Sequence, residues 1–187
     1  MAKTTRTKKW LKRLFIWLPL WFCIISIGQV LLLRWVNPPA SSFMAIRAVS
    51  AWLGGNTDFR IAYDWRDLQA VSAQLPIAVV ASEDQRFPTH HGFDFESMRK
   101  AYQSNRKGRK TRGASTISQQ LAKNLFLWSG RSYVRKALEA WYTLWIELLW
   151  PKRRILEVYV NVAEFGDGVY GAQAASMRYF GKPAKSL

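Results

Sequence analysis

The most prominent feature of the hydrophobic pattern is an apolar run over residues 14–33, which contains no charged side chain. As a helix, a run of this length rises about 30 Å, the thickness of the hydrocarbon core of a bilayer. A cleaved signal peptide is the alternative, but its apolar core is usually about 7–15 residues long and is followed by small residues. Here Arg34 and Trp35 follow. The run therefore predicts a retained transmembrane helix.

The residues before this run predict its orientation. Residues 1–13 carry six basic side chains and no acidic one, and basic segments beside a span stay on the cytoplasmic side. We therefore expect a cytoplasmic tail over residues 1–13, a span over residues 14–33 and an extracytoplasmic remainder. Because the motifs described below all lie beyond the span, a chain beginning after Trp35 is expected to keep its fold.

Beyond the span, the pattern predicts a connecting segment and one helical domain. Residues 34–63 form the juxtamembrane segment and linker, and apolar spacing over residues 43–53 indicates an amphipathic helix beside the membrane. Residues 64–187 form the domain, in which no segment shows convincing strand periodicity, so the fold class is mainly α and residues 164–171 are expected to form turns. The expected helices run from an N-cap at Asp64 to Leu75, from Pro76 to Glu83, over 93–102, onward from an N-cap at Thr116, from an N-cap at Ser132 to the residue before Pro151, over 152–162 and over 172–180.

The helix that follows Ser132 has two candidate faces. Arg135, Lys136 and Glu139 fall on the polar side, where Arg135 and Glu139 are spaced i,i+4. The simplest interpretation of that spacing is a surface ion pair worth about 0.2–0.5 kcal/mol. The opposite face is predicted to form a buried apolar stripe of Val134, Leu138, Trp141, Trp145 and Leu148.

Composition narrows the function classes. The formal net charge of +16 indicates an anionic partner: nucleic acid, a phospholipid surface or a phosphate-bearing substrate. The hydrophobic content of 49% argues against a disordered chain. The single cysteine, Cys23, excludes an intramolecular disulfide, a cysteine-rich zinc site and a cysteine redox pair.

A carboxylate pair marks the first candidate site. The apolar residues 76–81 predict a short buried helix that ends at Glu83. The negative end of the helix dipole and apolar surroundings both favour the neutral form of Glu83, as a general acid or base working near neutral pH requires. A Phe-Pro step and Gly92 then turn the chain, which places Glu83, Asp84 and His90 on one rim. The alternative is a solvated helix end with a salt-bridged glutamate and a loop histidine.

A long basic stretch follows the carboxylate pair. Residues 97–138 carry eleven basic side chains and no acidic one. Within this stretch, residues 103–113 contain no apolar side chain and are expected to form a mobile basic loop. Positive charge of this kind suits an anionic leaving group, because a departing diphosphate needs cations to stabilise its developing charge.

The helix start after the basic loop is the second candidate site. Thr116 and Gln119 fit a capping box, so the Gly113-to-Ser115 turn presents free backbone N–H groups that suit an anion. The first turns of this helix are expected to carry a polar face, for which an ordinary solvated face is the alternative. The members of that face are Gln119, Gln120, Lys123 and Asn124.

Four motifs occur in order along the chain: Glu83-Asp84-x-x-Phe87-x-x-His90-x-Gly92, Gly113-Ala114-Ser115-Thr116-Ile117-x-Gln119-Gln120-x-x-Lys123-Asn124, Arg135-Lys136-x-x-Glu139 and Lys152-x-x-Ile155-Leu156-Glu157-x-Tyr159-Val160-Asn161. Together they resemble the motifs of the peptidoglycan glycosyltransferases over about residues 65–182, and the short N-terminal anchor resembles their monofunctional biosynthetic transglycosylase branch. The resemblance implies a lysozyme-like, mainly helical fold. It also implies an enzyme that polymerises lipid II into glycan strands and releases undecaprenyl diphosphate.

The resemblance also assigns roles to individual residues. Glu83 becomes the catalytic base that deprotonates the 4-hydroxyl of the acceptor sugar, and Glu139 becomes the second catalytic carboxylate. Binding of the diphosphate and nearby substrate groups is assigned to Ser115, Gln120, Lys123, Arg131, Arg135 and Lys136. Supporting positions are Asp84, Phe87, His90, Gly92, Gly113, Thr116, Gln119 and Asn124. No metal ligands are indicated, no cofactor is required by the resemblance, and dependence on a divalent cation stays open.

The implied partners are lipid II, the growing glycan strand and the cytoplasmic membrane, with other cell-wall synthesis and division proteins as further candidates and nucleic acid excluded. The implied location is the inner membrane of a bacterium, crossed once, with the catalytic domain on the periplasmic or extracytoplasmic side. Members of the family usually continue with further helices beyond residues 181–187, so the sequence is consistent with a fragment truncated at its C-terminus.

Two other classes fit parts of the pattern. A lysozyme-like, glycan-cleaving enzyme would use Glu83 and Glu139 as paired carboxylates if they lie about 5–10 Å apart, but hydrolysis does not need the basic stretch. A non-enzymatic, membrane-anchored protein would hold anionic lipid or nucleic acid by charge alone. Such a protein would not need the polar face that contains Gln120 and Lys123, so the glycosyltransferase is the preferred interpretation.

Overall fold

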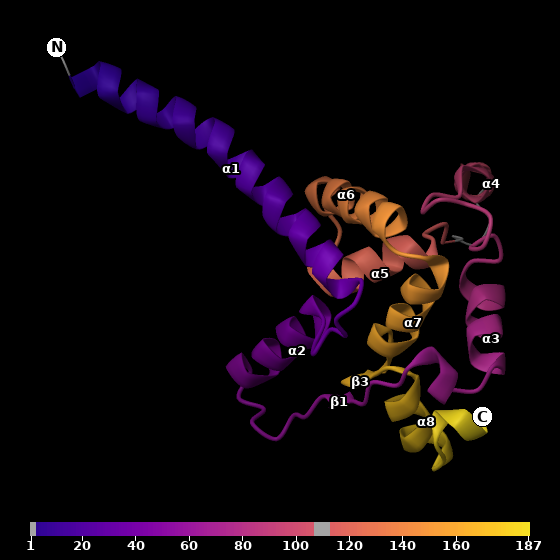
Figure 1. The fold of residues 1–187 in the computed structure, drawn as a ribbon. Coiled ribbons are helices and arrows are strands. Elements are labelled where there is room, and N and C mark those ends of the chain that lie inside the picture. Colours follow the sequence, from indigo (N-terminus) through magenta and orange to yellow (C-terminus); the bar gives the residue numbers. More distant parts are fainter. Residues whose placement is uncertain (1–2, 107–112) are drawn as a thin grey trace.

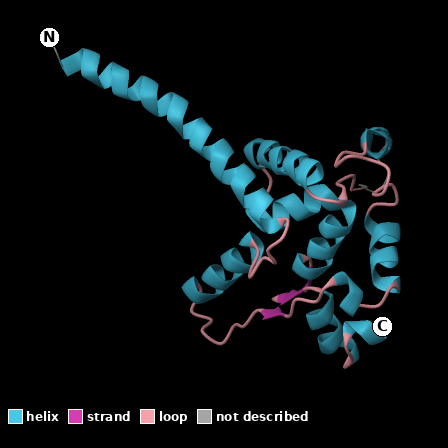
Figure 2. Cartoon of the chain, viewed as in Figure 1, coloured by secondary structure: helices cyan, strands magenta, loops and turns pink. Residues whose placement is uncertain are grey.

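The computed structural model describes residues 3–106 and 113–187, and the side chains of residues 15–104 and 113–187. The fold is mainly helical, as predicted (Figures 1 and 2). The helices are α1 (Lys3–Leu33), α2 (Ser42–Leu53), α3 (Gln74–Glu83), α4 (Phe95–Arg106), α5 (Ile117–Phe126), α6 (Tyr133–Leu149), α7 (Lys152–Val162) and α8 (Ala172–Phe180), and the 3-10 helices are η1 (Leu68–Ala70) and η2 (Ala184–Ser186).

Helix α5 lies at the centre of the fold. Its residues Ile117, Leu121 and Leu125 recur every four positions and are buried in one hydrophobic cluster with Ile146 of α6 and Val158 of α7. Around this core, α1 packs on α6, α2 packs on α5 and α3 packs on α7 (Figure 1). Most of the predicted site residues lie at the end of α3, in the loop that follows it, and along α5 and α6, which pack on each other.

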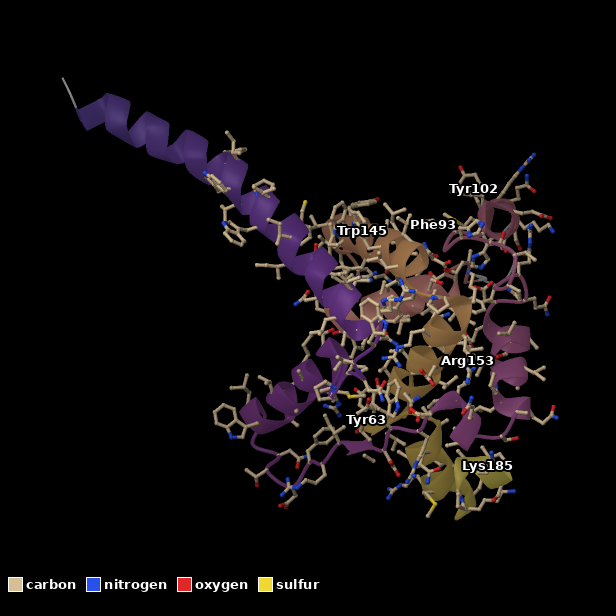
Figure 3. All side chains as sticks on the ribbon, viewed as in Figure 1. Tyr63, Phe93, Tyr102, Trp145, Arg153 and Lys185 are labelled. Atoms are coloured by element: carbon tan, nitrogen blue, oxygen red, sulfur yellow. The ribbon has the colours of Figure 1, made fainter. Side chains whose placement is uncertain are left out.

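Helix α1 is long and apolar enough to cross a membrane over Phe15–Leu33. Figure 3 shows that the side chains drawn along the middle of this helix stand clear of the rest of the chain, and Phe15 and Ile16 are 84% and 68% exposed. Its second half is docked: Val30 is fully buried, Trp141 Nε1 donates to Ser26 Oγ (3.0 Å) and Trp150 Nε1 donates to the Val30 carbonyl (2.8 Å). One helix therefore provides both the candidate anchor and a part of the core.

A small three-stranded sheet corrects the expectation that the domain has no strands. Strands β1 (Ala62–Tyr63), β2 (Glu164–Gly166) and β3 (Val169–Tyr170) are arranged in the order β1-β3-β2, with β1 parallel and β2 antiparallel to β3. The segment predicted as turns is thus a hairpin with an irregular register at Gly166. Strands of two or three residues are too short for an alternating pattern to reveal them.

The predicted helix from Asp64 to Leu75 is wrong. Apart from η1 and the first two residues of α3, residues 64–75 are not helical, and side chains of α7 bind backbone N–H groups of this segment. The backbone N–H of Arg66 donates to Asn161 Oδ1 (2.9 Å), and that of Leu68 donates to Glu157 Oε1 (3.0 Å). These long-range bonds satisfy the backbone without a helix and override the local pattern.

Helix α6 turns a different face to the core than predicted. Its buried residues are Glu139, Tyr142, Thr143 and Ile146, whereas Val134 and Leu148 of the expected stripe are 67% and 68% exposed. The half-buried Trp141 packs on Phe22 of α1, with ring centroids 6.0 Å apart. The middle of the predicted stripe, Leu138, Trp141 and Trp145, is half-buried and packs against the core cluster, while its two ends are exposed. This rotation matters for the site because it carries Glu139 inward.

Candidate active site

Glu83 is the last residue of α3, and its side chain is exposed. The predicted burial of this helix is wrong, because none of its residues is buried and Ile77 is 63% exposed. The apolar surroundings expected for Glu83 are therefore absent, while its place at the negative end of a helix remains. Glu83 Oε2 accepts a hydrogen bond from Gln120 Nε2 (3.1 Å), which joins α3 to α5.

Asp84 and His90 are both buried; Asp84 lines the same cleft as Glu83, as predicted, whereas His90 does not line it. His90 Nε2 lies 2.9 Å from Asp84 Oδ2, and His90 Nδ1 accepts from the backbone N–H of Gly92 (3.1 Å). Since Nδ1 accepts, Nε2 carries the proton and donates to Asp84. Asp84 Oδ2 also accepts from the backbone N–H of Ile117 (3.0 Å) at the start of α5. The carboxylate next to Glu83 thus ties its loop to α5.

A second set of contacts holds the loop at its far end. Lys152 Nζ of α7 donates to the carbonyl of His90 (2.7 Å) and to Glu147 Oε1 of α6 (2.9 Å). The same cation lies 4.4 Å from the ring centroid of the buried Phe87. Gly92 has φ +85°, and a Cβ there would lie 2.8 Å from Glu147 Cγ. The loop therefore packs against α6 so closely that only glycine fits.

The turn before α5 has the predicted capping box. Thr116 Oγ1 accepts from the backbone N–H of Gln119 (3.2 Å), and Gln119 Oε1 accepts from the N–H of Thr116 (3.0 Å). Thr116 Oγ1 also donates to the carbonyl of Gly92 (2.7 Å), so the two motif segments are bonded to each other. Gln119 is buried by its capping role and does not belong to the predicted polar face. Gly113 and Ser115 are exposed.

A cleft of about 410 Å³ opens beside Glu83. Its walls are the end of α3, the loop that follows it, α4 and the turn before α5, and they include Arg86, Lys100 and Ser115. Helix α4 continues past its predicted end at residue 102. The rest of the expected mobile loop, residues 107–112, lies outside the described residues, and five of the eleven basic side chains, Arg106 included, are not described.

A cationic cluster surrounds Glu139. This carboxylate is 3% exposed, accepts from Arg135 Nη1 (2.8 Å) and binds Lys136 Nζ. The expected surface ion pair is therefore wrong, since the rotation of α6 buries it. Arg135 Nε is buried without a hydrogen-bond partner in the described part of the chain. Lys123 on the neighbouring α5 completes the cluster. Burial lowers the pKa of Lys123, Glu139 raises it, and Arg135 and Lys136 lower it again.

The remaining predicted residues lie around this cluster. Lys123 Nζ is 5.5 Å from the ring centroid of Phe43 on α2. The Asn124 carbonyl accepts from Ser42 Oγ (3.1 Å), which ties α2 to the end of α5. Arg131 is exposed in the segment between α5 and α6. Gln120 and Lys123, three positions apart on α5, therefore connect Glu83 on one side with the cations around Glu139 on the other.

One site residue, Tyr159, was predicted only as a member of the fourth motif, with no role assigned to it. Tyr159 of α7 is buried, and its hydroxyl donates to Gln120 Oε1 (3.0 Å). Burial raises the pKa of Tyr159, and the negative charges of Glu83 and Asp84 raise it further, so the hydroxyl keeps its proton. A tyrosine in a buried position indicates that its hydroxyl has a hydrogen-bond partner, since a phenylalanine would fill the same space without needing one.

The arrangement combines an exposed carboxylate beside a cleft with a partly buried group of cations. Such a pairing can take a proton from a hydroxyl nucleophile and stabilise a departing anion. Within the described residues, no group of three or more His, Cys, Asp and Glu side chains could hold a metal ion.

Comparisons with known proteins place this arrangement in context. Residues 55–187 match a family model described as transglycosylase. The biosynthetic peptidoglycan transglycosylase of Xanthomonas axonopodis pv. citri (strain 306) is 57% identical over 189 residues, covering 100% of this chain and 75% of that protein. The protein of the same name from Xylella fastidiosa (strain M23) is 57% identical over 95% of this chain and 73% of its own length. That of Xanthomonas campestris pv. campestris (strain B100) is 59% identical over 90% and 69%.

Proposed function

The chain belongs to the transglycosylase family and is a peptidoglycan glycosyltransferase, and from this premise we propose that it polymerises lipid II with Glu83 as the base. Glu83 removes the proton from the 4-hydroxyl of the acceptor sugar, and that oxygen attacks the anomeric carbon of the donor. The bond from this carbon to the diphosphate breaks, and undecaprenyl diphosphate leaves with the bonding electrons. The single observation that carries this proposal is the contact of the exposed Glu83 with Gln120, one turn of α5 away from Lys123.

The cationic cluster is the proposed site of the diphosphate. Lys123 and Arg135 converge from α5 and α6, and both side chains are partly or largely buried, where a charge interaction is stronger than in water. A departing diphosphate would gain charge next to these donors, which is the requirement for stabilising the transition state. Lys136 and Arg131 lie nearer the surface and would meet more distant phosphate or sugar groups.

Glu139 is better suited to organising this cluster than to proton transfer. Both of its oxygens are engaged by cations, and its side chain is 4% exposed, so it has no route to a sugar hydroxyl. A glycosidase would need its second carboxyl group free and beside the scissile bond. The engagement of Glu139 therefore supports glycosyl transfer over the lysozyme-like alternative.

The membrane contacts fit a lipid-linked substrate. We propose that α1 crosses the cytoplasmic membrane once, with its basic tail inside and the domain outside. On α2, Val49, Trp52 and Leu53 are 54%, 70% and 72% exposed, so this helix offers an apolar face to the bilayer surface. Phe43 on the same helix lies beside Lys123. A substrate whose tail stays in the bilayer could thus reach the cationic cluster without leaving the membrane.

Incubation of the full chain with labelled lipid II tests the proposed function. We expect a polymer that lysozyme digests, and no cleavage of glycan strands added in place of lipid II. The variant Glu83→Gln serves as the matched negative control. Degradation of glycan strands without polymer formation would favour the hydrolase and contradict the proposal.

A further inference from the structure

Three helices contribute to a chain of hydrogen bonds that ends at Glu83. The Tyr159 hydroxyl of α7 donates to Gln120 Oε1 of α5 (3.0 Å), and Gln120 Nε2 donates to Glu83 Oε2 of α3 (3.1 Å). Gln120 Nε2 also lies 3.5 Å from the carbonyl of Ser115. Tyr159 itself is 6% exposed and belongs to the main hydrophobic cluster, so its ring is held by the core.

The chemistry of the three partners allows only one orientation of the Gln120 amide. A carboxylate and a carbonyl can only accept hydrogen bonds, so Glu83 and Ser115 both require the NH₂ end of the amide. The carbonyl end then faces Tyr159, which must donate. A side-chain amide has two orientations of similar shape, and the hydroxyl is the group that makes the second one unfavourable. If the amide turned over, its carbonyl oxygen would face the Glu83 carboxylate.

We propose that Tyr159 is a positioning residue for the glycosyl transfer, acting through Gln120 to hold Glu83 in the orientation of a base. This inference rests on the proposed function of Glu83. With Gln120 locked, one carboxylate oxygen of Glu83 is held by the amide and the other stays available for the acceptor hydroxyl. The buried hydroxyl keeps its proton because burial raises the pKa of Tyr159, so the lock persists over the working range of pH.

This role differs from the substrate-binding role that family resemblance gives to Gln120. A residue that binds substrate changes KM when it is removed, whereas a residue that orients the base changes kcat. It also differs from a purely structural role for Tyr159, because loss of packing would change stability without acting through Gln120. The positioning role therefore predicts a different result from substrate binding by Gln120 and from a purely structural role of Tyr159.

The test combines Tyr159→Phe, Gln120→Met and the double variant in the full chain, with initial rates on lipid II. Tyr159→Phe keeps the ring and removes the donor, so we expect kcat to fall about tenfold, the effect of one lost hydrogen bond, with KM within about twofold. Gln120→Met keeps the length of the side chain and should lower kcat at least as much. In the double variant, loss of the Tyr159 hydroxyl should lower kcat by less than about a further twofold. The Gln120 amide through which this hydroxyl acts on Glu83 is already absent.

Tyr63→Phe is the matched control, since it removes a part-buried hydroxyl that donates to the Pro38 carbonyl (2.8 Å) and has no contact with Glu83. Its kcat should equal that of the parent, and its loss of thermal stability should resemble that of Tyr159→Phe. Parental kcat for Tyr159→Phe, or single effects that multiply in the double variant, would overturn the inference. If Tyr159→Phe does not fold, a Gln120→Met protein with parental kcat overturns it instead. An active Glu83→Gln protein would point to failure of the proposed function itself.

Discussion

Replacing Glu139 by glutamine tests how the cationic cluster is built. The Glu139 side chain is 4% exposed and the Arg135 side chain is 11% exposed, so the pair is buried. Removing one partner of a buried ion pair usually costs about 3–5 kcal/mol, because the other charge is left without compensation. Glutamine keeps one hydrogen-bond acceptor for Arg135. The Lys136 side chain is 46% exposed, so its ammonium group can be solvated by water instead. We therefore expect the free energy of unfolding to fall by an amount at the lower end of this range, about 3 kcal/mol.

The same change should alter the pH dependence of activity. Burial lowers the pKa of Lys123, and Glu139 opposes this by raising it. Without the carboxylate, the pKa of Lys123 falls further, because the repulsion by Arg135 and Lys136 is no longer opposed. Lys123 binds the diphosphate only when protonated, so activity is lost as pH rises through its pKa. The alkaline limb of the rate profile should therefore move to lower pH in Glu139→Gln.

Thermal unfolding and a pH series of kcat/KM measure both effects. For a chain of this size, about 3 kcal/mol corresponds to a fall in Tm of about 6–12 °C. Glu96→Gln breaks exposed pairs with Lys100 and Arg86, whose side chains are 72% and 47% exposed, and should cost less than about 1 kcal/mol. Glu157→Gln breaks a similarly buried pair with Arg154 and should leave the alkaline limb in place. An unchanged Tm and limb for Glu139→Gln would refute the reasoning.

Three further predictions follow from single contacts. Lys123→Ala should lower kcat and raise KM in lipid II turnover, with kcat/KM reduced at least about tenfold and stability little changed; a parental rate would remove Lys123 from the diphosphate site. Gly92→Ala should cost about 2–4 kcal/mol in chemical denaturation, because its φ is +85° and its Cβ would lie 2.8 Å from the Glu147 side chain; an unchanged midpoint would contradict this. A chain beginning after Trp35 should keep its fold but have a lower Tm than the full chain in detergent, because it lacks the buried Val30; equal Tm values would contradict this.

The features that the sequence predicted best depend on neighbouring residues. The capping box of Thr116 and Gln119 and the N-cap Ser132 involve partners within three positions, and all form as expected. Helix α7 buries Ile155, Val158 and Val162 at helical spacing, but it also buries Arg154, Val160 and Asn161, because α3, α5, α6 and α8 all pack on it. Local chemistry is therefore sufficient to predict where a helix begins.

The features that were missed depend on distant partners. Helix α6 has two apolar neighbours, α1 and α5, so its pattern does not reveal which face is buried, and Glu139 was placed at the surface. The contacts of Glu83 with Gln120 and of Gln120 with Tyr159 join residues that are 37 and 39 positions apart. Such bonds leave no periodic signal in the sequence. The motif residues could be identified, but the connection between them required the fold.

The most direct test of the central claim is a comparison of Glu83→Gln with the parent in single-turnover reaction and in binding of lipid II. Glutamine keeps the size of the side chain and can still meet Gln120, but it cannot take a proton from a hydroxyl at neutral pH. The account predicts that the single-turnover rate falls at least about a hundredfold, the usual contribution of a general base, while lipid II affinity stays within about threefold. Normal elongation of glycan by Glu83→Gln would contradict the assignment of Glu83 as the base.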